Sequence, residues 1–473
     1  MESSEDARAI LMKQQFAALH ALNRKRASDH ETARTIKNAA SKVSYQQNVN
    51  LHSKAVAAST LSSKIVLVDV AGGCGGSLIA MAAAVQRLVD DGTRITLEVA
   101  HASDIKKDKA VMYSAAAAAL NIPVDVCVAD VRDETFFTEL LLQSWGADVL
   151  SSCFICKSVS KAGAKKGLKA IVDYITGLFR IIRICRPKQL FLECVEEIES
   201  DPDFLRLIIE PLEAMGYKLI HGKRDGSDYA DVRRSRWYCI GTLDIDEFNH
   251  INTLPPPPDR RRSDLKLKTI LLPPHRVTVG VRDSTLKVLR GRAVIDPLSR
   301  DAAPRWAYLG KGLLTKAQKA IQVAFGDADR FRYSSGIVNY QFFNVNEVIG
   351  FLAPTLTATA SSDWYYRDAY GIRLVVALEI ALLHGYPLPA IQALLLASRS
   401  LALAKQLRTK KVLKGCLDAR ADAIVRRAVG DGFILPVVED IFYRMLRARH
   451  RTQIREMVIE ELSERPSKRA RRM

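Results

Sequence analysis

Short apolar runs alternate with amphipathic stretches between residues 64 and 246 of the 473-residue chain. Runs of this kind predict buried strands, and the stretches between them predict helices. Strands that alternate with helices form a largely parallel sheet with helices on both faces, so the sequence predicts an α/β fold. The predicted strands are residues 65–70, 95–100, 124–129, 149–153, 189–195, 217–221 and 237–243.

The rest of the chain lacks this alternation. Residues 1–60 are basic and partly helical, with a helical pattern at 7–24. The prolines at 255–258, followed by arginines, indicate a stiff linker, because proline continues neither a helix nor a central strand. Residues 371–447 predict mostly helices, with a break before Pro436. The chain therefore divides into residues 1–60, 61–250, 251–350, 351–447 and a basic tail at 448–473.

The excess of basic residues indicates the kind of partner that the protein binds. The 70 Lys and Arg residues exceed the 52 Asp and Glu residues, which gives a net charge of +18 and predicts a polyanionic partner, with nucleic acid as the best fit. Eight scattered cysteines without a secretory signal predict a reducing compartment. The sequence has no apolar run of about 18 residues, so no membrane span is expected.

Candidate chemistry gathers at the ends of the predicted strands, where sites in parallel sheets lie. A Gly-rich turn follows the first strand, and Cys156 lies in a small-residue loop after the fourth. Glu193 ends the next strand, and Arg234 and Arg236 open the last one.

In kind and in order, these four segments resemble motifs of the cytosine-5 DNA methyltransferases. The Gly-rich turn is similar to the cofactor motif, Cys156 to the nucleophile, and Glu193 to the acid of the Glu-Asn-Val motif. Arg234 and Arg236 resemble the arginines of Gln-x-Arg-x-Arg. Further on, residues 354–357 and 373–387, with Glu379 and His384-Gly385-Tyr386-Pro387, are similar to the motif before the family's final helix. The resemblance covers roughly residues 64–400.

The chain also departs from the family pattern. Ile155 and Lys157 replace the Pro and Gln around Cys156, Cys194 replaces the Asn after Glu193, Val232 stands in place of the Gln before the arginines, and the Gly-Asn of the last motif is missing around residues 397–400. Ile155 leaves the nucleophile's backbone less constrained, because proline fixes φ. Activity is therefore a weaker expectation than ancestry.

The resemblance implies a Rossmann-like S-adenosylmethionine-dependent methyltransferase fold with a smaller target-recognition domain at 251–350. It implies S-adenosylmethionine as cofactor, with Asp104 accepting hydrogen bonds from ribose hydroxyls and Asp130 contacting the adenine. A Gly-rich turn alone serves a dinucleotide or simple packing equally well, and both acids have turn roles as alternatives. The implied cofactor residues are Asp69, Ala71, Gly72, Gly73, Cys74, Gly75, Gly76, Asp104, Ile105, Asp130 and Val131.

The implied reaction is methylation of carbon 5 of a flipped cytosine through a covalent cysteine adduct. The Cys156 thiolate would add to carbon 6, and Glu193, with a raised proton affinity, would hold the Watson-Crick edge of the base. Arg236 would hold oxygen 2 of the ring, while Arg234 would position Arg236 or a phosphate. The alternatives are a buried structural thiol for Cys156, a capping or surface acid for Glu193 and a solvated charge run for the arginines.

Cys153 and Cys156 have the spacing of a metal or redox motif, but a zinc site would need a second ligand pair, so no metal is predicted. DNA is the expected partner, with RNA methylation and a catalytically silent nucleic-acid-binding scaffold as alternatives. The basic cluster in residues 466–472 is of nuclear-localisation type, with a frayed solvated end as the alternative. We therefore expect a nuclear protein if the source is eukaryotic, and a cytoplasmic one otherwise.

Overall fold

The computed structural model describes residues 64–133, 146–153, 168–256, 258, 337–339, 364–368, 371–409 and 417–470. The predicted N-terminal extension, with its helical pattern at 7–24, lies outside these residues, as does most of the region predicted at 251–350.

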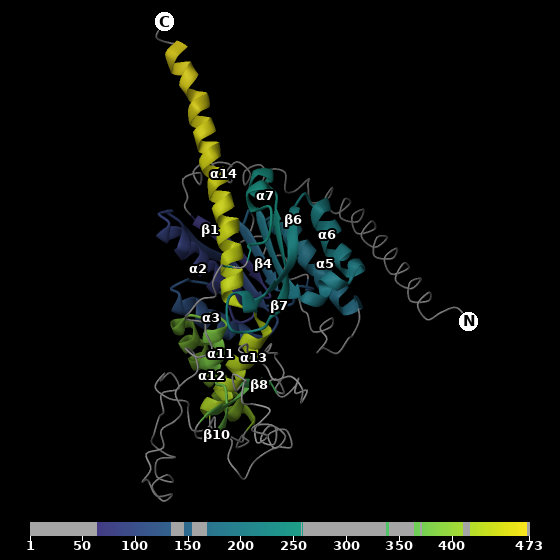
Figure 1. The fold of residues 1–473 in the computed structure, drawn as a ribbon, viewed down its shortest axis with the longest axis vertical. Coiled ribbons are helices and arrows are strands. Elements are labelled where there is room, and N and C mark those ends of the chain that lie inside the picture. Colours follow the sequence, from purple (N-terminus) through teal and green to yellow (C-terminus); the bar gives the residue numbers. More distant parts are fainter. Residues whose placement is uncertain are drawn as a thin grey trace, which may run out of the picture. The chain divides into compact units, whose positions relative to one another are not determined.

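The predicted α/β architecture is confirmed by a seven-stranded sheet of order β3-β2-β1-β4-β5-β7-β6 (Figure 1). Strands β1 to β5 run parallel, and β7 pairs antiparallel with both β5 and β6. This is a Rossmann-like arrangement. The strands are β1 Lys64–Val70, β2 Thr96–Asp104, β3 Val126–Val128, β4 Val149–Cys153, β5 Gln189–Val195, β6 Lys218–Asp225 and β7 Ser235–Thr242.

The central strands are buried on both faces, which explains their uninterrupted apolar sequences. Successive side chains of a strand point to opposite faces. Leu67 and Phe191 accordingly join one core cluster, while their neighbours Val68 and Leu190 are buried outside that cluster. Each apolar run therefore supplies two cores at once.

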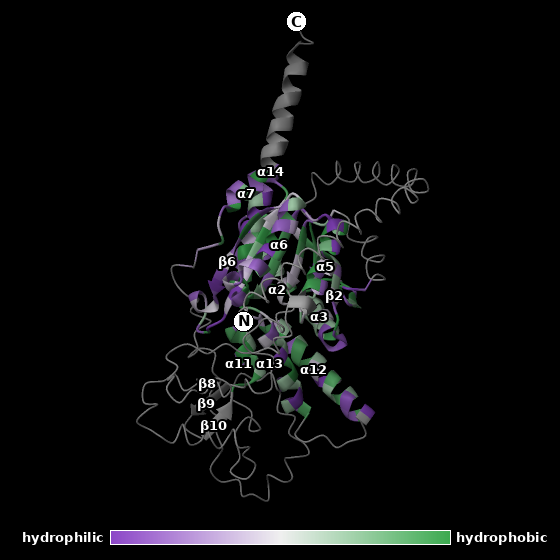
Figure 2. Cartoon of the chain, turned by 90° about the vertical axis from the view of Figure 1, so that its right-hand side faces the viewer, coloured by the Kyte–Doolittle hydropathy of each residue, from purple (hydrophilic) through white to green (hydrophobic). Residues whose placement is uncertain are grey.

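Helices cover the two faces. Helices α2 and α14 lie side by side, α12 packs against both α3 and α13, and α5 packs against α6 (Figure 1). Helix α6 alternates hydrophilic and hydrophobic residues along its turns, as a helix with one buried face should (Figure 2). The helices are α2 Gly76–Asp90, α3 Lys107–Ala119, α5 Leu168–Cys185, α6 Pro202–Ala214, α7 Ile245–Ile251, α11 Ala377–Leu383, α12 Leu388–Thr409, α13 Leu417–Asp431 and α14 Leu435–Ala470.

The C-terminal third differs from the sequence prediction in one place. Residues 371–374 were expected to begin a mostly helical region, but they form strand β10, Gly371–Leu374, which pairs antiparallel with β9, Trp364–Asp368. Strand β8, Ile337–Asn339, completes this second sheet. The predicted break before Pro436 is confirmed, because α13 ends and α14 begins just before it. No helix in the described parts has the length and apolar character needed to cross a membrane.

The strand order reverses between β1 and β4, since β2 lies on one side of β1 and β4 on the other. In open α/β sheets, ligands bind outside the carboxyl ends of the strands at such a reversal. The turn after β1 and the carboxyl ends of β4 and β5 lie at this edge.

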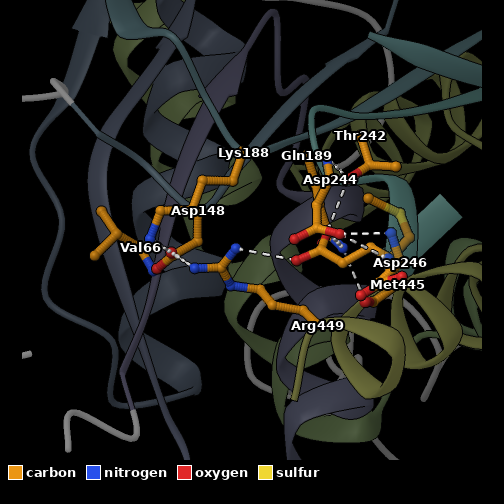
Figure 3. A network of polar contacts seen from close by, with 10 residues as sticks. Val66, Asp148, Lys188, Gln189, Thr242, Asp244, Asp246, Met445 and Arg449 are labelled. Carbon is orange, nitrogen blue, oxygen red and sulfur yellow. Dashed lines mark hydrogen bonds and ion pairs between the residues drawn. The ribbon is translucent and has the colours of Figure 1, made fainter. Parts of the chain in front are cut away.

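The opposite edge of the sheet holds a buried charged network that anchors α14 (Figure 3). Arg449 of α14 contacts two carboxylates, with Nη2 at 2.7 Å from Asp148 and Nη1 at 3.4 Å from Glu247. The Asp148 carboxylate also accepts the Val66 N–H at 2.9 Å, and Glu247 accepts the Thr242 hydroxyl at 2.8 Å. The network therefore joins the final helix to the start of the parallel sheet.

We expect Arg449→Met to lower the free energy of unfolding by about 3–5 kcal/mol, because it leaves buried carboxylates without their shared guanidinium. Urea denaturation measures this loss. The matched control is Arg206→Met on α6, where the arginine is more than half exposed and pairs with Asp203 and Glu210. That change should cost less than about 1 kcal/mol. Equal losses in the two variants would contradict a special role for the network.

Candidate functional site

The Gly-rich turn between β1 and α2 has a backbone that requires small residues. Ala71, Gly73 and Gly75 have φ values of 57°, 61° and 88°, in the left-handed region that favours glycine. A Cβ on Gly72 would lie 2.6 Å from the Tyr113 ring, so this glycine has no room for a side chain. The Gly72 N–H donates to the Ser103 carbonyl at 3.0 Å, which ties the turn to β2.

Asp69, on β1 just before the turn, stabilises the turn. Its carboxylate is fully buried and accepts hydrogen bonds from the hydroxyls of Ser77, Tyr113 and Ser151 at 3.2, 3.0 and 3.0 Å. Burial raises the pKa of Asp69 to about 6, against the lowering effect of these donors. The three donors come from α2, α3 and β4, so Asp69 fixes the position of the turn relative to its neighbours.

Asp104 ends β2 beside the turn. One carboxylate oxygen accepts the Gly73 N–H at 3.2 Å and the other accepts the Lys106 N–H at 2.8 Å. Burial raises its pKa, which the nearby Lys106 N–H and the Lys109 ammonium oppose. The next residue, Ile105, leaves 48% of its apolar side chain exposed. The edge of β2 thus offers a carboxylate next to an apolar surface.

Asp130 follows β3 and is bonded to Arg132, whose Nε lies 2.9 Å from one carboxylate oxygen. The Arg132 guanidinium lowers the pKa of Asp130. Val131 between them is buried, and a Cβ on Gly177 of α5 would lie 2.3 Å from its carbonyl oxygen. If the Asp130 carboxylate contacted an adenine, it would do so while still bonded to Arg132.

The turn between α13 and α14 closes over the Gly-rich turn from more than 300 residues away in sequence. A Cβ on Gly76 would meet both the Phe433 ring and the Tyr386 hydroxyl at 3.4 Å. The Tyr386 hydroxyl also lies 3.5 Å from the Cys74 sulfur. Helix α14 then packs along α2. The C-terminal segment is thus part of the site.

Glu193 lies two residues before the end of β5 and is buried with 5% exposure. Its carboxylate lies 3.1 Å from the Arg236 Nε, across the antiparallel pairing of β5 and β7. Burial raises the pKa of Glu193, while Arg236, Arg234 and a hydrogen bond with the Cys153 thiol act in the opposite direction. The raised proton affinity that the sequence predicted for this carboxyl is confirmed, and a surface role for Glu193 is wrong.

Comparisons with known proteins show which families the chain is similar to. The family model described as C-5 cytosine-specific DNA methylase matches residues 65–286, slightly less than half of the chain. The type II methyltransferase M.Bsp6I from Bacillus sp. (strain RFL6) is 30% identical over 117 residues, 24% of this chain and 37% of the relative. M.MspI from Moraxella sp is 34% identical over 102 residues, 20% of this chain and 24% of the relative. Residues 65–286 of the chain are thus similar to C-5 cytosine-specific DNA methylases.

The matched segments span well under half the length of these curated relatives. Among solved structures, the Entamoeba histolytica methyltransferase EhMeth has a TM-score of 0.50 and 11% sequence identity, and it covers 81% of this chain and 98% of that chain. This similarity speaks for the fold alone. Together with the strand order, it establishes a Rossmann-like methyltransferase fold for this chain.

Arg234 and Arg236 have different surroundings. Arg236 pairs with Glu193, with its Nε 3.1 Å from the carboxylate. Arg234 is buried with 1% exposure, and its Nη2 donates to the Gly430 carbonyl at 2.9 Å. A solvated position and a phosphate contact are therefore wrong for Arg234. Its guanidinium instead ties the start of β7 to the last turn of α13.

The polar residues of the motif at 373–387 stabilise the local structure. Glu379 accepts the Val376 N–H at 2.8 Å and caps α11. His384 ends that helix, and burial lowers its pKa to about 3, so its ring stays neutral. The Leu435 N–H donates to the His384 carbonyl at 2.9 Å. The motif thus holds the start of α14 in place, and residues 354–357 lie outside the described residues.

One element of the site lies elsewhere than the motifs suggest. Residues 397–400, where the last motif was expected, lie within α12, whereas Phe433, just after α13, packs at Gly76 of the Gly-rich turn. Asp431 lies 2.7 Å from Lys109, the residue nearest to the open side of Gly73. The closely spaced Gly430, Gly432 and Pro436 at a helix break were the available signal.

Cys156 lies outside the described residues, which stop at the end of β4 and resume at α5. Cys153, the last residue of β4, pairs in register with Glu193 on β5. The Tyr174 hydroxyl donates to the Cys153 carbonyl at 3.3 Å and so fixes the end of the strand. The last described residue before Cys156 is therefore in register with Glu193.

Proposed function

We propose that this protein transfers the methyl group of S-adenosylmethionine to carbon 5 of cytosine in DNA. The observation that carries the proposal is the buried Glu193, held by Arg236 at 3.1 Å and set in register with the strand end that leads to Cys156. The similarity of residues 65–286 to C-5 cytosine-specific DNA methylases supports the reaction class. The altered residues around Cys156 make the activity itself a matter for experiment.

The residues at the Gly-rich turn fit S-adenosylmethionine. The Gly73 backbone is open on one side, where a Cβ would meet nothing nearer than Lys109 at 4.0 Å, so a ligand can approach it closely. Asp104 would accept hydrogen bonds from ribose hydroxyls, and exposed Ile105 would cover one face of the adenine. When bound, the cofactor supplies an electrophilic methyl group for carbon 5.

The protein's own groups would prepare the cytosine ring. The Cys156 thiolate adds to carbon 6, which makes carbon 5 electron-rich. Glu193 places a proton at ring nitrogen 3 as charge builds there, and its raised pKa suits proton donation. Arg236 holds oxygen 2 of the ring with a permanently charged guanidinium. After carbon 5 loses its proton, the bond from carbon 6 to Cys156 breaks and the ring is restored.

A cytosine inside a duplex cannot reach these residues, so we propose that the base is flipped out, at a cost of a few kcal/mol. The net charge of +18 supports phosphate contacts that would offset this cost and make binding salt-sensitive. We retain residues 251–350 as the proposed target-recognition region and the basic cluster at 466–472 as a proposed nuclear-localisation signal.

The proposal is tested by incubating the full chain and labelled S-adenosylmethionine with duplex DNA and, in parallel, with tRNA. Nucleoside mass spectrometry after digestion should detect 5-methyl-2′-deoxycytidine in the DNA reaction. Label in tRNA alone would shift the substrate to RNA. Failure to label either, with no covalent complex on DNA that contains 5-fluorocytosine, would identify a silent nucleic-acid-binding relative.

A further inference from the structure

Lys109 of α3 is a largely buried lysine with one strong partner. Its ammonium lies 2.7 Å from the carboxylate of Asp431, the last residue of α13, and the two side chains are 18% and 33% exposed. Lysine is rarely buried unless it is paired. Burial lowers the pKa of Lys109, but the Asp431 carboxylate outweighs that effect, so the net shift is upward and the lysine stays protonated in a partly hydrated pair.

This ion pair borders the open side of the Gly-rich turn. The atom nearest to a Cβ built on Gly73 is the Lys109 Nζ, at 4.0 Å. The Gly73 N–H points to Asp104, the proposed ribose ligand, at 3.2 Å. The ammonium and the Asp431 carboxylate thus lie where the turn after β1 meets the turn before α14. In this fold, that is the part of the site next to the first strand.

A simple latch between helices explains the pair less well. Lys109 and Asp431 lie on α3 and α13, and α12 already packs against both of these helices. A partly exposed ion pair adds little to such packing. The pair is also placed at the backbone of the proposed cofactor turn, which a latch does not require.

We infer that Lys109 and Asp431 bind the two charges at the amino-acid end of S-adenosylmethionine: Lys109 the carboxylate and Asp431 the α-ammonium. This inference rests on the proposed function. The cofactor's amino-acid end carries one negative and one positive group on the same carbon, so each protein group exchanges its present partner for a ligand group of the same charge. No charge is left unpaired in either state, which avoids the cost of a lone buried ion.

The test is calorimetric binding of three ligands to the full chain. S-adenosylmethionine carries both charged groups, its decarboxylated form lacks the carboxylate, and 5′-methylthioadenosine lacks both. Lys109→Met should lower the affinity for S-adenosylmethionine on the order of 10- to 100-fold, and should change the affinities for the other two ligands by less than about threefold. Asp431→Asn should lower the affinities for S-adenosylmethionine and for its decarboxylated form, and should leave the affinity for 5′-methylthioadenosine unchanged.

Two further variants are controls. Lys109→Arg keeps the cation and should retain most of the affinity for S-adenosylmethionine. Lys107→Met changes an exposed lysine on the same helix and should alter no affinity. Unchanged binding of 5′-methylthioadenosine shows in the same titrations that each variant is folded.

Two results would overturn the inference while the proposed function stands: equal weakening of all three ligands by Lys109→Met, which indicates a packing role, or unchanged binding of S-adenosylmethionine. If the unaltered chain binds S-adenosylmethionine no better than 5′-methylthioadenosine, the inference also fails. If it binds none of the three ligands, the proposed function fails first and the inference falls with it.

Discussion

Replacing Cys156 by alanine is expected to abolish product formation, with a loss of at least about 10³-fold, because no other atom would form the bond to carbon 6. Binding of S-adenosylmethionine should be unchanged, since Cys156 follows β4 and the proposed cofactor residues follow β1, β2 and β3. Nucleoside mass spectrometry measures the product, and calorimetry measures cofactor binding.

The matched control for this variant is Cys153→Ala, three residues earlier. Cys153 is half-buried at the end of β4 and bonded to Glu193, so its loss should lower the rate modestly and leave the chemistry intact. Trapping on DNA that contains 5-fluorocytosine separates the two thiols, because only a working nucleophile remains attached. An adduct that persists in Cys156→Ala and vanishes in Cys153→Ala would transfer the nucleophile to Cys153.

The central strands were predictable because their environment leaves little choice. Strands β4 and β5 have the bounds that the apolar runs predict, Val149–Cys153 and Gln189–Val195. A strand buried on both faces must be apolar throughout, so the sequence marks where it begins and ends. Glu193 is the exception within β5, and an acid in such a run is itself a functional signal.

Strands with polar ends were longer than predicted. Strand β2 continues to Asp104, four residues beyond the predicted end at 100, through the buried polar residues His101 and Ser103. Strand β6 continues to Asp225 at the edge of the sheet, where one side needs no apolar residues. Hydrophobic periodicity cannot find such segments, because hydrogen bonding to the neighbouring strand stabilises them.

The packing of the C-terminal segment against the Gly-rich turn could not be predicted from the sequence, because it depends on contacts between distant segments. Arg234 looked like half of a solvated charge pair, yet its guanidinium is buried against the Gly430 carbonyl. Asp431 belongs to no motif in the sequence, yet it pairs with Lys109. A charged residue is predicted to be exposed unless its partner is known, and here each partner lies about 200 residues or more away.

Glu193→Gln is expected to lower the rate of methyl transfer by about 10²- to 10⁴-fold, because glutamine fits the same space but cannot deliver a proton. The raised pKa of Glu193 keeps the carboxyl protonated to a higher pH than an exposed glutamate. The rate should therefore fall as the pH rises through that pKa, and the glutamine variant should lose this limb of the profile.

The matched control is Glu199→Gln, the same chemical change just after β5. Glu199 pairs with Lys223 near the surface, so the variant should keep both the rate and the pH profile of the unaltered chain. Steady-state methylation of duplex DNA across the pH range measures both. Because removal of the negative charge also frees Arg236, cofactor binding should be measured alongside, and it should not change. A glutamine variant with the unaltered rate and pH profile would show that the buried carboxyl only anchors Arg236, and the roles proposed for the base-binding pocket would fail with it.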